Sequence, residues 1–178
     1  MKLNLGCGDR VIPGFTGVDI ADAWVGGPHD TPDGYQQVDL AGPWPWENSS
    51  VDEVLALDVC EHIADCAHAL WIKRHPLGRI HFINELHRVL KPGGRATIET
   101  PDASRGVGFT QDPSHVSPWC RSTFKYFEHG AFAHTRLSKA YGITAAFKVI
   151  EMAALGPMSG EGYGEQVYKI RAVLEAVK

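Results

Sequence analysis

The chain has 178 residues and a formal net charge of −4 at pH 7, and 44% of its residues are hydrophobic. This length suits one domain with a substantial core, so we expect a single domain over residues 1–178. The sequence lacks the basic stripe that tracks a nucleic-acid backbone, and it has no apolar run long enough to span a bilayer. These features argue against duplex nucleic acid and membrane as partners and favour a small molecule.

Short apolar runs alternate with amphipathic stretches along the chain, which is typical of an α/β fold with a mainly parallel sheet. The last run alternates with period two, as expected for a strand with one buried face. We predict seven strands, at Lys2–Leu5, Thr16–Asp19, Gln36–Asp39, Asp52–Leu57, Arg95–Thr100, Ala146–Ala153 and Gln166–Val177.

Two helices and two loops are predicted between these strands. Apolar residues at helical spacing predict a helix over Ile80–Leu90, which Lys91-Pro92-Gly93-Gly94 ends because proline cannot continue a helix. A shorter helix is predicted to begin with Ser122 as its N-cap. Glycine and proline recur in Ala21–Tyr35 and Gly156–Gly164, so both segments are predicted loops.

The four cysteines show no C-x-x-C spacing, and a predicted strand begins at the second residue. We therefore expect reduced, mostly buried thiols in a cytoplasmic protein. The four positions are Cys7, Cys60, Cys66 and Cys120.

The first strand runs directly into Gly6-Cys7-Gly8, and the second ends at Asp19. Glycine lets a backbone approach a ligand closely, although G-x-G alone also fits an ordinary tight strand exit. A dinucleotide fingerprint needs a third glycine and an acid about twenty residues on. Here the third glycine is missing and Asp19 follows Gly6 by only thirteen positions, which argues against an NAD-dependent oxidoreductase.

Acidic residues also follow other predicted strands. A carboxylate at Asp19 can accept hydrogen bonds from both hydroxyls of a ribose, and Asp39 can receive an adenine amino group. The fourth strand ends in Asp58-Val59-Cys60-Glu61-His62. Ligands of parallel α/β sheets bind outside the carboxyl ends of the strands, so we expect these groups to share one site.

The order of the motifs in this sequence resembles that of the Rossmann-type (class I) S-adenosylmethionine (SAM)-dependent methyltransferases. The motifs are, in order, L-N-L-G-C-G … V-D-I … V-D-L … P-W-E-N-S-S-V-D-E-V … D-V-C-E-H-I … E-L-H-R-V-L-K-P-G-G. The resemblance covers residues 2–100 and is greatest to a small bacterial and phage branch with a shortened first helix. It implies a three-layer Rossmann-like fold: a seven-stranded, mainly parallel sheet of order 3-2-1-4-5-7-6, with the last strand antiparallel and helices flanking it. It also implies SAM as the cofactor.

Residue by residue, the resemblance implies that Gly6, Cys7 and Gly8 lie under the methionine end of SAM. Asp19 would hold the ribose, Asp39 with the Leu40 amide the adenine, and Asp58 would lie near the methionine moiety. Asn4 stands where the family often has an acid, and asparagine cannot place a negative charge near the ammonium. The cofactor-binding residues predicted in this way are Asn4, Gly6, Cys7, Gly8, Asp19, Ile20, Asp39, Leu40 and Asp58.

Methyl transfer requires alignment of the reacting atoms and exclusion of water, and a hydroxyl or protonated amine acceptor also needs a base. We predict Glu61, His62 and His115 as catalytic residues, with Asp58 and Asp102 as further candidate bases. The alternatives are structural: an acid at Glu61 also suits a helix N-terminus, and His115 also suits a hydrogen bond to a loop carbonyl.

A divalent metal is a further alternative. Asp58, Glu61 and His62 stand at i, i+3 and i+4, a spacing similar to the Glu-x-x-Glu-His cluster of metal-dependent O-methyltransferases. His115 would be the fourth ligand. Family members without a metal also carry Glu-His here, and aspartate is shorter than the usual glutamate. We therefore assign no metal ligands.

Motifs that are missing from the sequence exclude some classes of methyl acceptor. No (D/N/S)-P-P-(Y/F/W) motif follows the fourth strand, which argues against methylation of DNA adenine or of cytosine at N4. Cys60 is not preceded by proline, which argues against methylation of cytosine at C5. The sequence thus predicts methyl transfer from SAM to a small molecule, at oxygen. The alternative is a catalytically silent SAM-binding module or accessory subunit.

Overall fold

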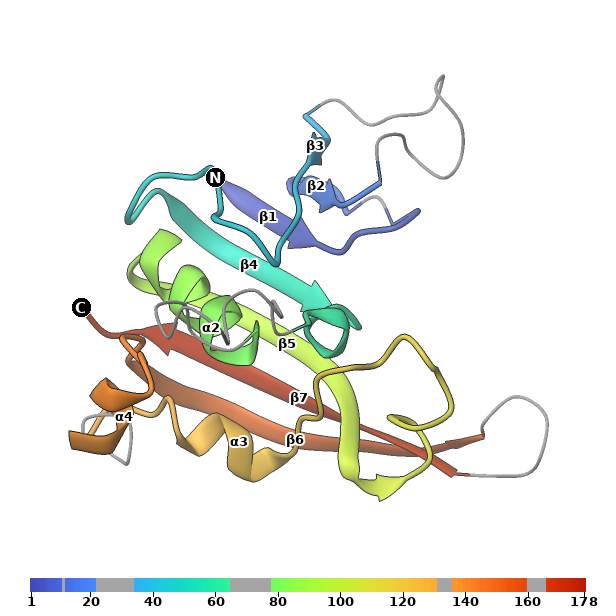
Figure 1. Ribbon diagram of the computed structural model, residues 1–178. Helices are drawn as coiled ribbons and strands as arrows, with labels where there is room; N and C mark the ends of the chain where they lie inside the picture. The colour runs from blue at the N-terminus through green and yellow to red at the C-terminus, as the bar shows by residue number, and fades with distance from the viewer. Residues whose placement is uncertain (11, 22–33, 65–77, 131–135, 160–165) are drawn as a thin grey trace.

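The computed structural model describes residues 1–10, 12–21, 34–64, 78–130, 136–159 and 166–178, and its core is a seven-stranded sheet (Figure 1). The strand order is β3-β2-β1-β4-β5-β7-β6. The strands are β1 (Lys2–Leu5), β2 (Thr16–Asp19), β3 (Gln36–Gln37), β4 (Val51–Leu57), β5 (Leu90–Gly106), β6 (Phe147–Ser159) and β7 (Gln166–Ala176).

The pairing confirms the predicted fold class. The strands from β3 to β5 pair in parallel, whereas β7 is antiparallel to both β5 and β6. Because the carboxyl ends of the parallel strands meet at one edge, the segments after β1, β2, β3 and β4 lie side by side there. The described residues between β1 and β2 form turns.

Some strands are shorter and others longer than the sequence predicted. β3 is shorter than predicted and forms only two rungs with β2. β5 is much longer than Arg95–Thr100 because β7 pairs with it as far as Gly106. Gly156, predicted as the start of a loop, lies within β6. The rest of that loop from residue 160, the central part of the predicted Ala21–Tyr35 loop, and Cys66 lie outside the described residues.

Three α-helices and a short 3-10 helix are described. They are η1 (Cys60–His62), α2 (Gly78–Val89), α3 (Arg121–Lys125) and α4 (Arg136–Ala140). The predicted N-cap Ser122 is wrong: Cys120 is the N-cap, and its backbone N–H donates to the Thr123 hydroxyl at 3.2 Å. None of the described helices is long and apolar enough to cross a membrane.

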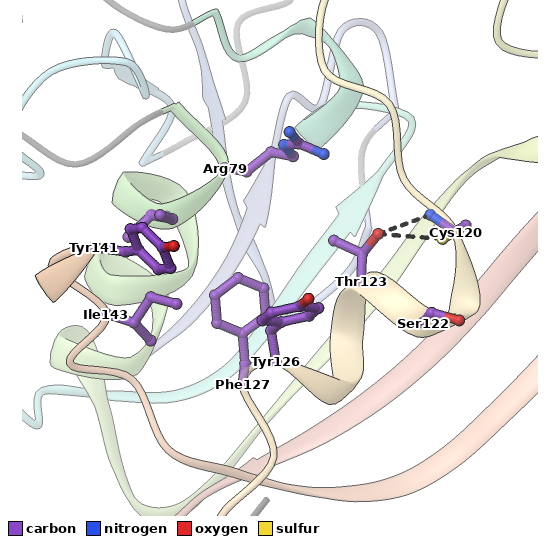
Figure 2. Close-up of a pocket in the computed structure, with 9 residues that line it drawn as sticks. Arg79, Cys120, Ser122, Thr123, Tyr126, Phe127, Tyr141 and Ile143 are labelled. Carbon is purple, nitrogen blue, oxygen red and sulfur yellow. Dashed lines mark hydrogen bonds between the residues drawn. The ribbon is translucent and has the colours of Figure 1, made fainter. Parts of the chain in front are cut away.

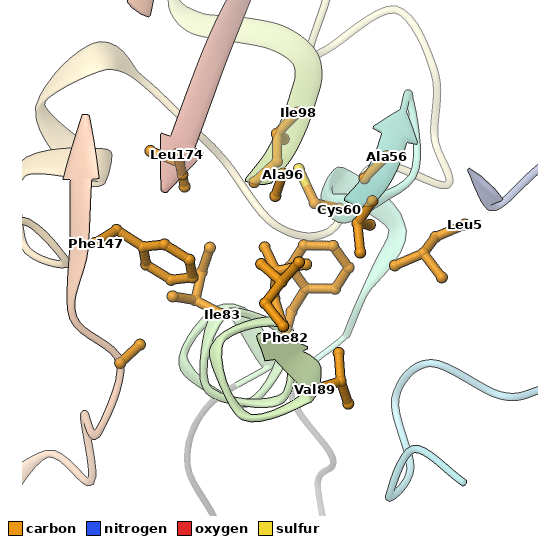
Figure 3. Packing of buried hydrophobic residues seen from close by; sticks show 14 of the residues in the cluster. Leu5, Ala56, Cys60, Phe82, Ile83, Val89, Ala96, Ile98, Phe147 and Leu174 are labelled. Atoms are coloured by element: carbon orange, nitrogen blue, oxygen red, sulfur yellow. The ribbon is translucent and has the colours of Figure 1, made fainter. Parts of the chain in front are cut away.

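The core lies between α2 and the sheet (Figure 3). Phe82 and Ile83 of α2 are fully buried against Ala96 and Ile98 of β5 and Phe147 of β6. This packing explains the apolar pattern from which the helix was predicted. It also holds the strand ends that form the site.

Replacing Phe82 with alanine is expected to lower the free energy of unfolding by about 3–5 kcal/mol, because it removes a fully buried ring and leaves a cavity. Urea denaturation measures this change. The matched control is Tyr141→Ala, since the Tyr141 side chain is 58% exposed and its loss is expected to change stability by about 0.5 kcal/mol or less. Equal effects of the two substitutions would contradict the described core.

Candidate active site

A cleft of about 560 Å³ lies at the carboxyl edge of the parallel strands. Its lining comes from the segments that follow β1, β2, β3 and β4, and three of its side chains are carboxylates. The lining residues are Gly6, Asp19, Ile20, Val38, Asp39, Leu40, Ala41, Asp58, Val59, His62, Ile63 and Ala64.

Glycine is required where β1 ends. Gly6 has a φ of 59°, and a Cβ there would lie 2.4 Å from Cγ2 of Val59. The exits of β1 and β4 are therefore in contact, which only a residue without a side chain permits. Gly8 also has a positive φ, and its backbone N–H donates to Oδ2 of Asp19 at 2.9 Å.

The acids after β2 and β3 are held by backbone donors. Oδ1 of Asp19 accepts from the Ile20 N–H at 2.8 Å, so both of its oxygens are fixed by main chain. Oδ1 of Asp39 accepts from the Ala41 N–H at 2.9 Å. Oδ1 of Asp19 also accepts from the Ala21 N–H at 3.4 Å, so its remaining acceptor capacity is on Oδ2. Both acids can therefore still accept a hydrogen bond from a ligand in the cleft.

Two predicted cofactor residues lie behind the cleft. Asn4 is only 3% exposed, and its side-chain amide donates to the Arg10 carbonyl at 3.1 Å. Cys7 is buried as well, and burial raises the pKa of its thiol. Neither residue lines the cleft, and the predicted cofactor residue Gly8 does not line it either, so the part of all three is to shape the turn after β1.

Asp58 lies at the β4 end of the cleft and is ion-paired. Its φ is 57°, and its backbone N–H donates to the Glu99 carbonyl of β5 at 2.9 Å. Its Oδ2 lies 2.5 Å from Nζ of Lys169, a residue of β7. The period-two alternation predicted for this strand could not identify Lys169 as the partner of Asp58.

Glu61 is fully buried directly behind the cleft. Its Oε2 accepts from the Thr100 hydroxyl at 3.0 Å, whereas Oε1 has no hydrogen-bond partner among the described residues. Burial raises the pKa of this carboxyl group. Its backbone carbonyl accepts from the N–H groups of Val116 and Ser117, each at 2.9 Å, and so anchors the loop that carries His115.

The three predicted catalytic residues are brought together. The rings of His62 and His115 have centroids 4.8 Å apart, and Nε2 of His115 lies 4.0 Å from Oε1 of Glu61. Nδ1 of His115 lies 2.9 Å from the Phe109 carbonyl, which can only accept, so Nδ1 carries the hydrogen. The predicted carbonyl contact of His115 and its place beside Glu61 therefore occur together.

Of the two histidines, only His62 lines the cleft. Its Nδ1 lies 3.1 Å from the Ser114 hydroxyl, which in turn donates to Asp112 at 2.6 Å. The hydroxyl hydrogen is engaged by Asp112, so Nδ1 of His62 is the donor and Nε2 keeps its lone pair. Asp102 is different: it is 2% exposed, receives the Ser104 N–H and hydroxyl, and does not line the cleft.

Three of the four residues in the metal hypothesis remain together. Possible ligand atoms of Glu61, His62 and His115 lie within 4.8 Å of one another, a set that a divalent cation can use. Asp58 is not part of this group, and its carboxylate is instead paired with Lys169.

No family profile matches the sequence, and no curated protein matches it either. Solved structures do match. A SAM-dependent methyltransferase from Archaeoglobus fulgidus is 14% identical with a TM-score of 0.55, over 98% of this chain and 85% of that one. The 1,6-didemethyltoxoflavin-N1-methyltransferase of Burkholderia thailandensis, solved with S-adenosylhomocysteine (SAH), is 12% identical with a TM-score of 0.59, over 99% and 71%. The cyclase SpnF is 15% identical with a TM-score of 0.61, over 99% and 74%.

The chain has a methyltransferase fold. In this methyltransferase fold, the described cleft occupies the carboxyl edge of the parallel strands, where such sheets bind their ligands.

A second cavity of about 400 Å³ lies between α2 and α3 (Figure 2). Tyr126 and Phe127 line one side, and Tyr141 and Ile143 the other. It shares no lining residue with the cleft and contains no carboxylate to receive a ribose. The cleft is therefore the better candidate for a nucleoside-containing cofactor.

Proposed function

We propose that the protein is a SAM-dependent methyltransferase and that SAM occupies the cleft. The observation that carries the proposal is the spatial order in which three carboxylates and a glycine turn lie along the sheet edge. Asp39, Asp19, the Gly6 turn and Asp58 follow β3, β2, β1 and β4, which are neighbours in that order. Adenine, ribose and methionine follow one another in the same order in SAM.

Each group suits the part of SAM assigned to it. Asp19 accepts hydrogen bonds from the ribose hydroxyls, and Asp39 with the Leu40 amide receives the adenine. The Gly6 turn, held against Val59, forms the cleft wall between the ribose position and Asp58, and the methionine chain of SAM would lie along it. Asp58 is then the group proposed for the methionine end, and His62, which follows β4 as Asp58 does, lines the same cleft.

The acceptor we propose is a small molecule that is methylated at oxygen. Nε2 of His62 takes the acceptor's hydroxyl proton while the oxygen–methyl bond forms and the sulfur–methyl bond breaks, leaving neutral SAH. Glu61 and His115 support His62 from behind, through their contacts with one another and with the 116–117 loop.

A catalytically silent SAM-binding module is the second candidate. One structural neighbour, SpnF, is described as a cyclase, so this fold also serves chemistry other than methyl transfer. This candidate keeps the cofactor cleft and removes the role of His62 as a base. Methyl transfer to a panel of low-molecular-weight alcohols, phenols and carboxylic acids separates the two candidates.

Calorimetric titration tests the cofactor assignment. SAM and SAH are expected to bind the purified protein with micromolar affinity, and NAD is expected not to bind, since the cleft has no third glycine for a pyrophosphate. If SAM and SAH fail to bind at millimolar concentration, both candidate functions are wrong.

A further inference from the structure

The charge of the cleft does not match the methionine end of SAM. That end is a zwitterion with an ammonium and a carboxylate, whereas the cleft lining has three carboxylates and no lysine or arginine. A ligand carboxylate placed beside Asp58 would be repelled unless a cation joined it. A lysine or arginine partner for that carboxylate must therefore come from outside the lining.

Lys169 is the described cation that reaches this wall. Its Nζ lies 2.5 Å from Oδ2 of Asp58, and the two side chains are 24% and 30% exposed. Lys169 pairs in register with Pro101 of β5, and its side chain reaches Asp58 after the end of β4. Arg171, two residues along β7, is paired with Glu99 instead.

Asp58 is the described carboxylate available to the ammonium of SAM at the methionine end of the cleft. Asn4, where the resembled family often has an acid, is neutral, buried and directed at the Arg10 carbonyl. Asp19 is at the ribose position, with both of its oxygens held by backbone N–H groups. Asp58 is thus the carboxylate that can meet the ammonium, and it is the one that Lys169 already holds.

We propose that the Asp58–Lys169 pair recognises the amino-acid end of SAM by exchanging partners. The donor's ammonium binds Asp58, and its carboxylate binds Lys169, so one ion pair becomes two. A partly exposed ion pair contributes little stability, so opening it is not a barrier to binding. This inference rests on the proposed function and names the residues that select a zwitterionic donor.

The test compares ligands that differ only at the amino-acid end. SAH, its decarboxylated analogue and methylthioadenosine are titrated into the unsubstituted protein, Lys169→Met and the matched control Arg171→Met. Lys169→Met is expected to weaken SAH binding by about 10- to 100-fold, the range for a lost charge-assisted hydrogen bond, and to leave methylthioadenosine unchanged. Arg171→Met is expected to change neither.

The decarboxylated analogue isolates the carboxylate contact. In the unsubstituted protein it is expected to bind more weakly than SAH, and in Lys169→Met the two are expected to bind equally. Lys169→Arg is expected to restore most of the preference for SAH. Unchanged methylthioadenosine binding shows in each case that the variant is folded.

Three results would overturn the inference. The first is equal SAH affinity in Lys169→Met and Arg171→Met. The second is a loss of methylthioadenosine binding equal to the loss of SAH binding. In both cases the unsubstituted protein still binds SAH, so the proposed function stands. The third is binding of neither ligand to the unsubstituted protein, which overturns the proposed function and this inference with it.

Discussion

Asp19→Ala is expected to weaken SAH binding by about 100-fold or more, because two ribose hydroxyls lose a charged acceptor. The substitution also releases the Gly8 and Ile20 N–H groups that the carboxylate now fixes, so the glycine turn loses its orientation. Isothermal titration calorimetry measures the affinity, and thermal unfolding shows whether the variant is folded.

Asp9→Ala is the matched control, since Asp9 lies in the same turn, is exposed and does not line the cleft. Its affinity for SAH is expected to equal that of the unsubstituted protein. Asp19→Asn keeps the shape of the side chain and loses its charge, and an intermediate affinity is expected. If Asp19→Ala binds SAH as well as Asp9→Ala does, the ribose assignment is wrong.

His62→Gln is expected to lower kcat for an accepted alcohol or phenol by about 10²- to 10⁴-fold, the usual contribution of a general base. SAH affinity is expected to change little, because His62 is proposed to act on the acceptor and is not one of the residues proposed to bind the cofactor. Transfer of labelled methyl from SAM measures kcat. His129→Gln is the control, as His129 is exposed and outside the cleft.

Activity assays with added EDTA distinguish two roles for His62, a general base and a metal ligand. We expect activity to be unchanged by EDTA, because His62 is proposed to take the proton itself. Loss of activity with EDTA and recovery with magnesium or manganese would instead assign Glu61, His62 and His115 as ligands of a divalent cation. Full activity of His62→Gln without a metal requirement would leave no role for His62 in the chemistry.

Local sequence signals were sufficient for the bounds of the first two strands and for the edge at which the acids gather. Lys2–Leu5 and Thr16–Asp19 are strands with the predicted bounds, because each is a short apolar run that ends at a glycine or an acid. The acids at Asp19 and Asp39 could be placed at one edge because parallel strands present their carboxyl ends together.

Contacts that depend on long-range register could not be predicted. The Asp58–Lys169 pair requires the antiparallel pairing of β7 with β5, and residues 111 positions apart in sequence carry no local signal of it. The contact between His62 and Ser114 spans 52 positions. The predicted N-cap of α3 was wrong for another reason. The hydroxyl that accepts from the N–H of the actual N-cap, Cys120, belongs to Thr123, which lies inside the helix.

The two hydrogen bonds to the Glu61 carbonyl have a consequence for how this site can change in evolution. Because the 116–117 loop is tied to main chain, that anchor is independent of the side chain at position 61. A descendant with a different residue there keeps the loop in place and loses only the buried carboxylate. The scaffold of the site and its chemistry can therefore diverge separately, which suits a fold that serves several reactions.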